Sequence, residues 1–203
     1  MRKAQFSALI SVLTCVLLTS AWPQSSGSTG TQVIRYEPSG TLPDSGRNGY
    51  CWTSSIAAPF RPDAWRCTEG NVIHDPCFSL ADQEQVVCGV NPVVKKSGFV
   101  LRLTKPLPQS NVSSNPASQN WAWMIELSDG TVCTPFTGTR PFISGETGFY
   151  GCNSINSAKQ FLLMGDLDSS KAVWTARRAT LVKAGNQWVI QSSQTVSVKV
   201  VWQ

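Results

Sequence analysis

The sequence has few of the residues that build metal or catalytic centres. It contains one histidine, His74, and its closest cysteines, Cys67 and Cys77, are ten residues apart, without a CxxC pair. Structural zinc sites need four such ligands in closely spaced pairs. A GxSxG motif, the usual nucleophile turn of serine hydrolases, is also absent. The sequence therefore predicts no metal, no cofactor and no recognisable nucleophile.

Long helices and later membrane spans are missing too. After residue 21 no segment is apolar enough to cross a bilayer, and no stretch repeats apolar residues at helical spacing over a long helix. Charged residues make up 14% of the chain, and its net charge is only +5. The adjacent bases Lys95-Lys96 and Arg177-Arg178 would point to opposite faces of a strand. We therefore expect no nucleic-acid partner and no membrane span once the leader is removed.

The first 21 residues have the pattern of a secretory signal peptide. Arg2 and Lys3 precede an apolar run over residues 8–18, and the small residues 19–21 suit a cleavage site. An uncleaved anchor and a lipoprotein cleavage site before Cys15 are the alternatives. We expect a secreted or extracytoplasmic protein, located in the periplasm or at the cell surface.

The rest of the chain divides into a linker and one domain. Residues 23–32 are mostly Ser, Gly and Thr, which offer little apolar surface to offset chain entropy. We predict a flexible linker over residues 22–46 and a single disulfide-stapled β domain over residues 47–203. That length is enough for a sizeable core.

Six of the seven cysteines follow the leader, and an even set in an exported chain predicts three disulfides. Six cysteines allow fifteen pairings, which the sequence does not distinguish. Pairing of neighbours is attractive because each pair brackets a short turn-forming or strand-forming segment, and each bridge would contribute about 3 kcal/mol. The six are Cys51, Cys67, Cys77, Cys88, Cys133 and Cys152.

Two-residue alternation of apolar side chains recurs along the chain, which is typical of half-buried strands. Phe99, Leu101 and Leu103 alternate with other residues. Residues 121–127 alternate in the same way, with two tryptophans predicted to share a face with Ile125 and Leu127. The Asp129-Gly130 pair that follows is a preferred hairpin turn, and the chain returns over residues 131–134.

Further strands are expected near the end of the chain and in shorter segments before it. Residues 173–182 and 187–192 are rich in strand formers, and Val196, Val198, Val200 and Trp202 are predicted to line one face of a last strand. Shorter candidates are residues 50–54, 64–67, 72–75, 85–88, 148–152 and 160–164. The sequence thus predicts an all-β fold, an antiparallel sandwich or barrel, with a disulfide-rich, loop-rich N-terminal cap.

Candidate site residues are few, and each has a structural alternative. His74 could act as a general base oriented by a carboxylate, or be an ordinary strand residue. Asp166 and Asp168 are spaced as in calcium loops, but the glycine and glutamate of an EF-hand are absent, so a turn needs no metal there. The remaining acids, which include Glu126, Asp129 and Glu146, could supply a carboxylate pair for glycoside cleavage.

Tryptophan is abundant, and exposed indoles would suit sugars or aromatic ligands. Trp52 and Trp65 each lie next to a cysteine. They are therefore ligand candidates whose alternative role is packing against a disulfide.

Several motifs resemble a family of uncharacterised bacterial secreted or extracytoplasmic domains. They are GYCWTSSIA at residues 49–57, RPDAWRC at 61–67, the segment 71–78 that ends in DPCF, YGC at 150–152, GDLD at 165–168 and VWQ at 201–203. Together they cover nearly all of the predicted domain. The resemblance implies a bacterial source, export across the inner membrane and a self-contained module of this size. It implies no activity, and no role for any residue.

These observations favour a secreted or extracytoplasmic, non-enzymatic module that binds an envelope or extracellular ligand, either a glycan or a protein. A stapled β scaffold presents binding loops well. The alternative is a secreted hydrolase that uses His74 or a carboxylate pair.

Overall fold

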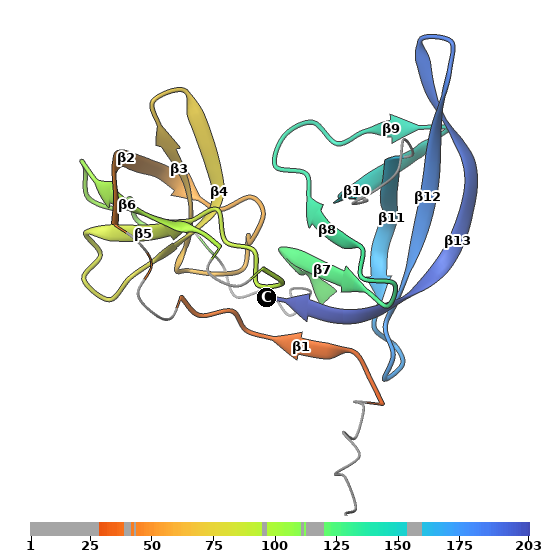
Figure 1. Ribbon diagram of the computed structural model, residues 1–203, viewed down its shortest axis with the longest axis horizontal. Coiled ribbons are helices and arrows are strands. Elements are labelled where there is room, and N and C mark those ends of the chain that lie inside the picture. Colours follow the sequence, from red (N-terminus) through yellow and green to blue (C-terminus); the bar gives the residue numbers. More distant parts are fainter. Residues whose placement is uncertain are drawn as a thin grey trace, which may run out of the picture.

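The chain forms two closed β-barrels that lie side by side (Figure 1). The computed structural model describes residues 29–38, 42, 44–94, 97–110, 112, 120–153 and 160–203. The predicted signal peptide and the adjacent bases Lys95-Lys96 lie outside the described residues. The predicted all-β fold is confirmed, and the disulfide-rich N-terminal part, expected as a cap, is itself a barrel.

The N-terminal barrel is a meander of five strands. Neighbours along the chain pair antiparallel, and the first strand closes the barrel by pairing parallel with the last. The parallel closure follows from the odd number of strands, because the first and last members of such a meander run in the same direction. The strands are β2 (Asp44–Ser54), β3 (Ala64–Glu69), β4 (Val72–Ser79), β5 (Gln85–Cys88) and β6 (Phe99–Leu103).

The C-terminal barrel closes through an antiparallel pair, β13 with β7, as an even-numbered meander requires. Its ring consists of β7 (Met124–Leu127), β8 (Val132–Pro135), β10 (Glu146–Asn153), β11 (Gln160–Asp168), β12 (Thr175–Ala184) and β13 (Gln187–Trp202). Two short strands attach to this ring. β9 (Phe142–Ile143) pairs with β10, and β1 (Gln32–Ile34) pairs parallel with the end of β13.

The six cysteines form three disulfides between neighbours along the chain, Cys51–Cys67, Cys77–Cys88 and Cys133–Cys152. Each joins two residues that face one another on paired strands, so each bridge staples one strand pair. Three disulfides indicate an oxidising, extracellular environment.

No helix among the described residues is long and apolar enough to cross a membrane.

Most of the predicted strands are observed. The Phe99 to Leu103 alternation forms β6, the Asp129-Gly130 turn joins β7 to β8, and all six shorter candidates lie within strands. The predicted segment 173–182 corresponds to β12. The segment 187–192 and the predicted last strand, which contains Val196 to Trp202, form one continuous strand, β13. The strands β1 and β9 were not expected. β1 and the first residues of β2 lie within the range 22–46 that the sequence predicts as a linker.

The structure contradicts two predicted apolar strand faces, the one over residues 121–127 and the one over residues 196–202. β7 begins only at Met124, and Trp123 packs between the barrels while Ile125 packs inside the C-terminal one. Just before β7, the Trp123 amide donates to the carbonyl of Trp202 (2.9 Å), the residue of β13 that pairs with Met124.

The last strand also changes face along its length. A register shift between Val198 and Val200 places Val198 in the barrel core and Val200 with Trp202 in the cluster between the barrels. An extra residue at a β-bulge reverses the alternation of side chains beyond it.

A shared apolar cluster joins the barrels. The N-terminal barrel contributes Phe78, the C-terminal one Trp123, and Tyr36 lies against both rings at centroid distances of 5.0 and 5.5 Å. The C-terminal end of β13 lies between the barrels in Figure 1, where it supplies Trp202 to this cluster. The two barrels therefore bury part of their core against one another.

One surface ion pair gives the fold an acid-dependent contribution to stability. Burial raises the pKa of Asp129, but hydrogen bonds from Arg178 and Thr131 outweigh it and lower the pKa to about 2. A depressed carboxyl pKa stabilises the fold above the unfolded value near pH 4, and this stabilisation is lost as the pH falls toward 2.

We expect Asp129→Asn to destabilise the protein at pH 7 by about 1 kcal/mol or less, because the carboxylate is half exposed and solvent-screened. The difference from wild type should shrink between pH 4 and pH 2. Urea denaturation of both proteins across that range tests this. A difference that is constant with pH would contradict it.

Candidate functional site

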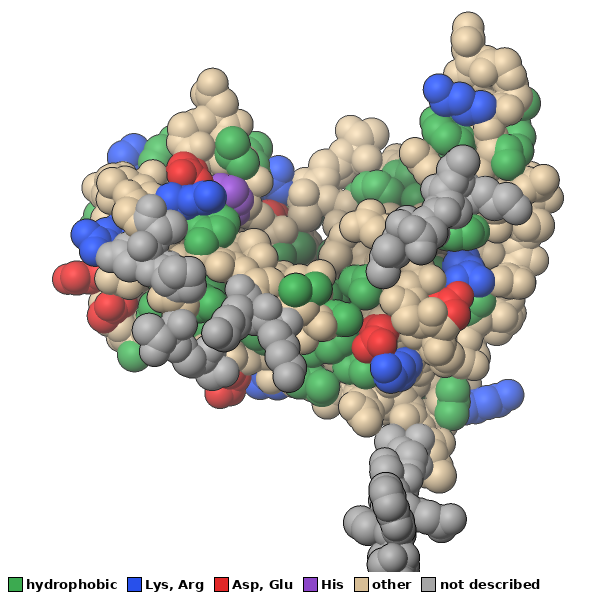
Figure 2. Space-filling model, in the orientation of Figure 1, with side chains coloured by type: hydrophobic (Ala, Val, Ile, Leu, Met, Phe, Trp, Pro, Cys, Tyr) green, Lys and Arg blue, Asp and Glu red, His purple; other side chains and the backbone are tan. Residues whose placement is uncertain are grey.

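A cleft separates the two barrels, and Figure 2 shows it as a hollow with hydrophobic side chains at its base. Described residues of both barrels line several cavities, and the two larger ones differ in their linings. One has a volume of about 350 Å³, and its lining includes the candidate His74 as well as Asp75, Pro76, Val90 and Met124. The other has a volume of about 500 Å³, and we call it the Trp121 groove. It is lined by Thr53, Ser54, Ile56, Phe60, Trp121 and Arg140, among others.

The loop after β2 separates the two cavities, and Asp75 holds it in place. The Asp75 side chain is only 2% exposed. It accepts hydrogen bonds from the Ser55 hydroxyl (2.5 Å) and from the backbone amides of Ile56 (3.1 Å) and Ala57 (3.3 Å). A buried carboxylate with this many donors is a rigid anchor rather than a free base.

Arg66 balances the charge of Asp75 and connects the barrels. Its Nη1 donates to Asp75 Oδ2 at 2.9 Å and to the carbonyl of Thr137, beyond β8, at 2.8 Å. The same guanidinium lies 5.8 Å from the ring centroid of Trp52. The wall between the cavities therefore depends on a buried ion pair within the N-terminal barrel, and the Arg66 hydrogen bond to Thr137 links this pair to the other barrel.

Trp121 enters the groove from the segment before β7 and is fixed at two points. Its indole Nε1 donates to the carbonyl of Ala57 in the N-terminal barrel, at 2.7 Å. Its ring also lies against Tyr150 of β10, with centroids 5.7 Å apart. This side chain is therefore preorganised by both barrels.

Arg140 faces Trp121 from the segment between β8 and β9. Its guanidinium carbon lies 4.6 Å from the ring centroid of Phe149 and 5.8 Å from that of Trp121. Among the residues that the structure describes, no carboxylate lies within 4.0 Å of it. The cation is thus held on aromatic faces without a carboxylate counter-ion there.

Two glycines of β10 let the segment that carries Arg140, residues 136–141, lie close to the sheet. A Cβ on Gly151 would lie 3.1 Å from the ring of Phe136, and one on Gly148 would lie 3.1 Å from Pro141 Cγ. The Gly148 amide also donates to the carbonyl of Pro141, at 2.9 Å. Close packing on both sides of Arg140 fixes the backbone that presents it.

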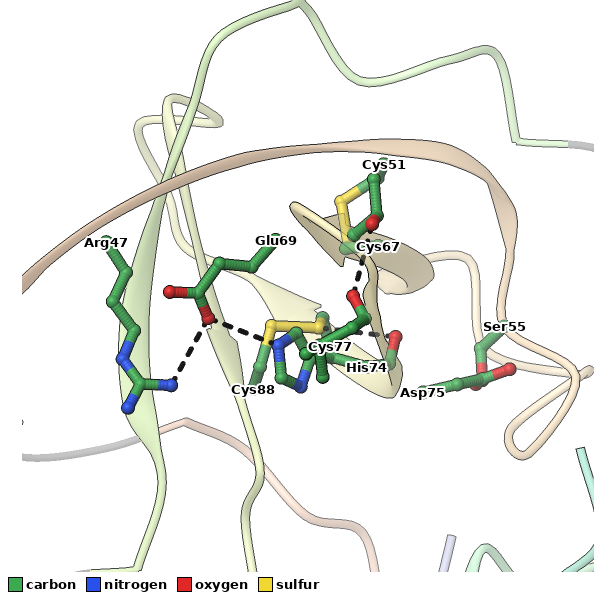
Figure 3. Close-up of a disulfide and its surroundings, with 11 residues drawn as sticks. Arg47, Cys51, Ser55, Cys67, Glu69, His74, Asp75, Cys77 and Cys88 are labelled. Carbon is green, nitrogen blue, oxygen red and sulfur yellow. Dashed lines mark hydrogen bonds and ion pairs between the residues drawn. A yellow bond between two sulfur atoms is a disulfide. The ribbon is translucent and has the colours of Figure 1, made fainter.

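His74 points away from Asp75, as neighbours on a strand do (Figure 3). Its Nε2 lies 3.4 Å from Glu69 Oε2, which is itself 3.2 Å from Arg47 Nη1. The ring packs edge-on against Phe99, 5.0 Å between centroids, and the side chain is 14% exposed. Across the described part of the chain, no hydroxyl forms a hydrogen bond with His74. The structure does not assemble a nucleophile, base and orienting acid around it.

The other predicted candidates are divided between the two barrels. Trp65 is buried with both disulfides of the N-terminal barrel, as its alternative role predicted. Trp52 is 41% exposed, because Cys51 takes the inward position beside it. The exposed side chains of Asp166 and Asp168 belong to β11 of the other barrel.

The aspartates of β11 have different surroundings. Asp168 accepts a hydrogen bond from the Ser170 amide (3.0 Å), which lowers its pKa. Burial raises the pKa of Tyr150, and the nearby charge of Asp166 raises it further. The Asp168 side chain thus accepts a hydrogen bond from the turn that follows β11. Asp166 instead lies near Tyr150, whose ring packs against Trp121.

The carboxylates considered as an acid pair each have a different basic partner. Lys199 lies 2.7 Å from Glu126, whereas Arg178 pairs with Asp129 at 2.5 Å and Arg177 with Glu146. Asp129 and Glu146 are half-exposed members of surface ion pairs, whereas Glu126 is mostly buried beside Lys199.

Within the described ranges, the one group of three side chains of metal-ligand type is Cys67, Cys77 and Cys88. All three sulfur atoms are in disulfides, so none is a thiolate.

Sequence reasoning missed the Trp121 groove. It placed Trp121 on a buried strand face and gave no role to Phe60 or Arg140. The indole of Trp121 is half-buried and Arg140 is exposed. A signal was present in the aromatic and basic residues themselves, but the sequence does not show that they meet.

Comparison with known proteins adds no relative: no protein-family model, no curated protein and no solved structure matches the chain. The resemblance to bacterial secreted domains stays a prediction.

Proposed function

We propose that this protein is a secreted or extracytoplasmic binding module that holds a glycan in the Trp121 groove. The observation that carries the proposal is the groove itself, in which residues of both barrels bring an aromatic ring and a cation together over about 500 Å³. Ligand sites occur preferentially at such junctions, and this volume is within their usual range of about 300–1,000 Å³.

The chemistry of the groove suits a sugar. The aromatic side chains Trp121 and Phe60 offer apolar faces to the C–H groups of a pyranose ring. Thr53 and Ser54 place hydroxyl groups along the same groove. The described lining includes no carboxylate and no histidine, so the proposal assigns it binding and no acid–base step.

The scaffold also supports binding without large rearrangement. The disulfides Cys51–Cys67 and Cys77–Cys88 staple the barrel that supplies residues 53–60. Asp75 and Trp121 hold that loop from opposite sides. A preformed site loses little conformational entropy when the ligand binds.

The proposal includes the cellular location. The disulfides require an oxidising compartment, and the leader pattern of residues 1–21 directs the chain there. The resemblance to bacterial secreted domains favours the periplasm or the cell surface of a bacterium. The glycan would then be a component of the envelope or of the surrounding medium.

The test is a screen of the full chain, expressed with its own leader and purified without reductant, on an array of defined oligosaccharides. Isothermal titration calorimetry then measures the affinity for each glycan that binds. We expect Trp121→Ala to weaken binding about tenfold or more, because central aromatic contacts carry much of the energy of a site.

Trp52→Ala is the matched control, since it removes an exposed tryptophan outside the groove lining. It should leave the affinity within about twofold, and thermal melts check that both variants are folded. If Trp52→Ala loses binding while Trp121→Ala keeps it, the proposed position of the site in the Trp121 groove is wrong. A wild-type protein that binds no glycan, or only a protein from the same envelope, would refute the proposal.

A further inference from the structure

The charge on Arg140 identifies the class of glycan. Among the arginines that the structure describes, six lie within 4.0 Å of a carboxylate, namely Arg35, Arg47, Arg61, Arg66, Arg177 and Arg178. Arg102 also has an interaction partner. Arg140 is the exception, since no described carboxylate lies within that distance of it, although it is well positioned by its neighbours.

The surroundings of Arg140 favour a planar anion whose two oxygen atoms can accept hydrogen bonds from one guanidinium at the same time. A guanidinium that lies on an aromatic face keeps N–H edges for a bidentate partner, and it is less strongly hydrated than an ammonium group. Phe149 and Trp121 supply those faces, at 4.6 and 5.8 Å from the guanidinium carbon. A carboxylate matches this donor geometry.

The charge of Arg140 is not offset from the other side of the groove. Asp75 bonds to Ser55 at the groove wall, but Arg66 is already its counter-ion, at 2.9 Å. The charges of Asp166 and Arg140 both act on Tyr150, but among the ion pairs of the described residues none joins Asp166 to Arg140 within 4.0 Å. A negative ligand group would therefore find a cation that is free to pair with it.

We infer that the glycan bound in the Trp121 groove carries a carboxylate, as a uronic acid or another acidic sugar does. The sugar ring lies on Trp121, and its carboxylate accepts hydrogen bonds from Arg140. This inference rests on the proposed function, because it names the ligand class of the same groove.

The test compares each acidic oligosaccharide that binds with its carboxyl-reduced form, which differs only in the loss of the charged group. Calorimetry should show the wild-type protein binding the acidic form about tenfold or more tightly. Arg140→Gln should remove this preference, so that this variant binds the acidic and the reduced forms with equal affinity. Arg140→Lys should restore part of it, since a lysine keeps the charge without the bidentate geometry.

Lys171→Gln serves as the charge-matched control, because it removes one exposed positive charge outside the groove. It should keep the preference for the acidic form. Equal binding of acidic and reduced forms, or a preference for phosphate or sulfate esters over carboxylates, would overturn the inference while leaving glycan binding intact. Binding of no glycan at all would instead remove the proposed function.

Discussion

Replacing Asp75 by alanine is expected to lower the free energy of unfolding by about 3–5 kcal/mol, because it breaks a buried ion pair and leaves Arg66 without its partner. The substitution also removes the acceptor for Ser55 and for the amides of Ile56 and Ala57. Each buried donor left unpaired adds to the loss. The loop that separates the two cavities would lose its anchor.

Urea denaturation at pH 7 without reductant measures this effect. Asp75→Asn keeps the size of the side chain but removes its charge, so its loss should be intermediate. Asp82→Ala is the control in the same barrel, because Asp82 is exposed and its carboxylate accepts the Glu84 amide at 3.1 Å. It should cost about 1 kcal/mol or less. Equal losses for Asp75→Ala and Asp82→Ala would show that the network contributes little.

Replacing Arg61 by leucine should cost about 3 kcal/mol or more, since this buried arginine connects both barrels. Its side chain is only 6% exposed and pairs with Asp63. It also donates to the carbonyls of Tyr36 and of Gln203, the latter at 2.9 Å. Leucine would remove one donor from each of these carbonyls and the close guanidinium partner from the Asp63 carboxylate.

Differential scanning calorimetry of Arg61→Leu gives the loss of stability. Arg47→Leu is the matched control, because its side chain is 44% exposed, it pairs with Glu69 rather than with Asp63, and surface pairs contribute little. Adding Asp63→Asn to Arg61→Leu should recover part of the loss, since the uncompensated charge is then gone. An Arg61→Leu protein that melts like the wild type would contradict this account.

Strand formation depends on local pattern, and so it could be predicted. The alternation of side chains from Phe99 to Leu103 specifies a half-buried strand, and it does so whichever strands become its neighbours in the sheet. The Asp129-Gly130 turn positions its two strands by itself, and Gly130 adopts the positive φ of 82° that the turn needs.

The faces of residues near the barrel junction could not be predicted in the same way. Trp121 and Trp123 continue the alternation of Ile125 in the sequence, yet they leave the strand to bond with Ala57 and Trp202 on other elements. The bulge before Val200 likewise has no local signal. Partners far along the chain decide these directions.

The sequence by itself determined a disulfide-stapled, all-β protein, because cysteine number and two-residue periodicity are local properties. Tertiary structure alone decided the closure into two barrels, with β2 beside β6 and β13 beside β7. It also decided the position of the Trp121 groove, whose lining comes from the loop after β2, the segment before β7 and the segment after β8. Those segments meet only once both barrels have closed and packed on their shared apolar cluster, so no pattern within any one of them encodes the site.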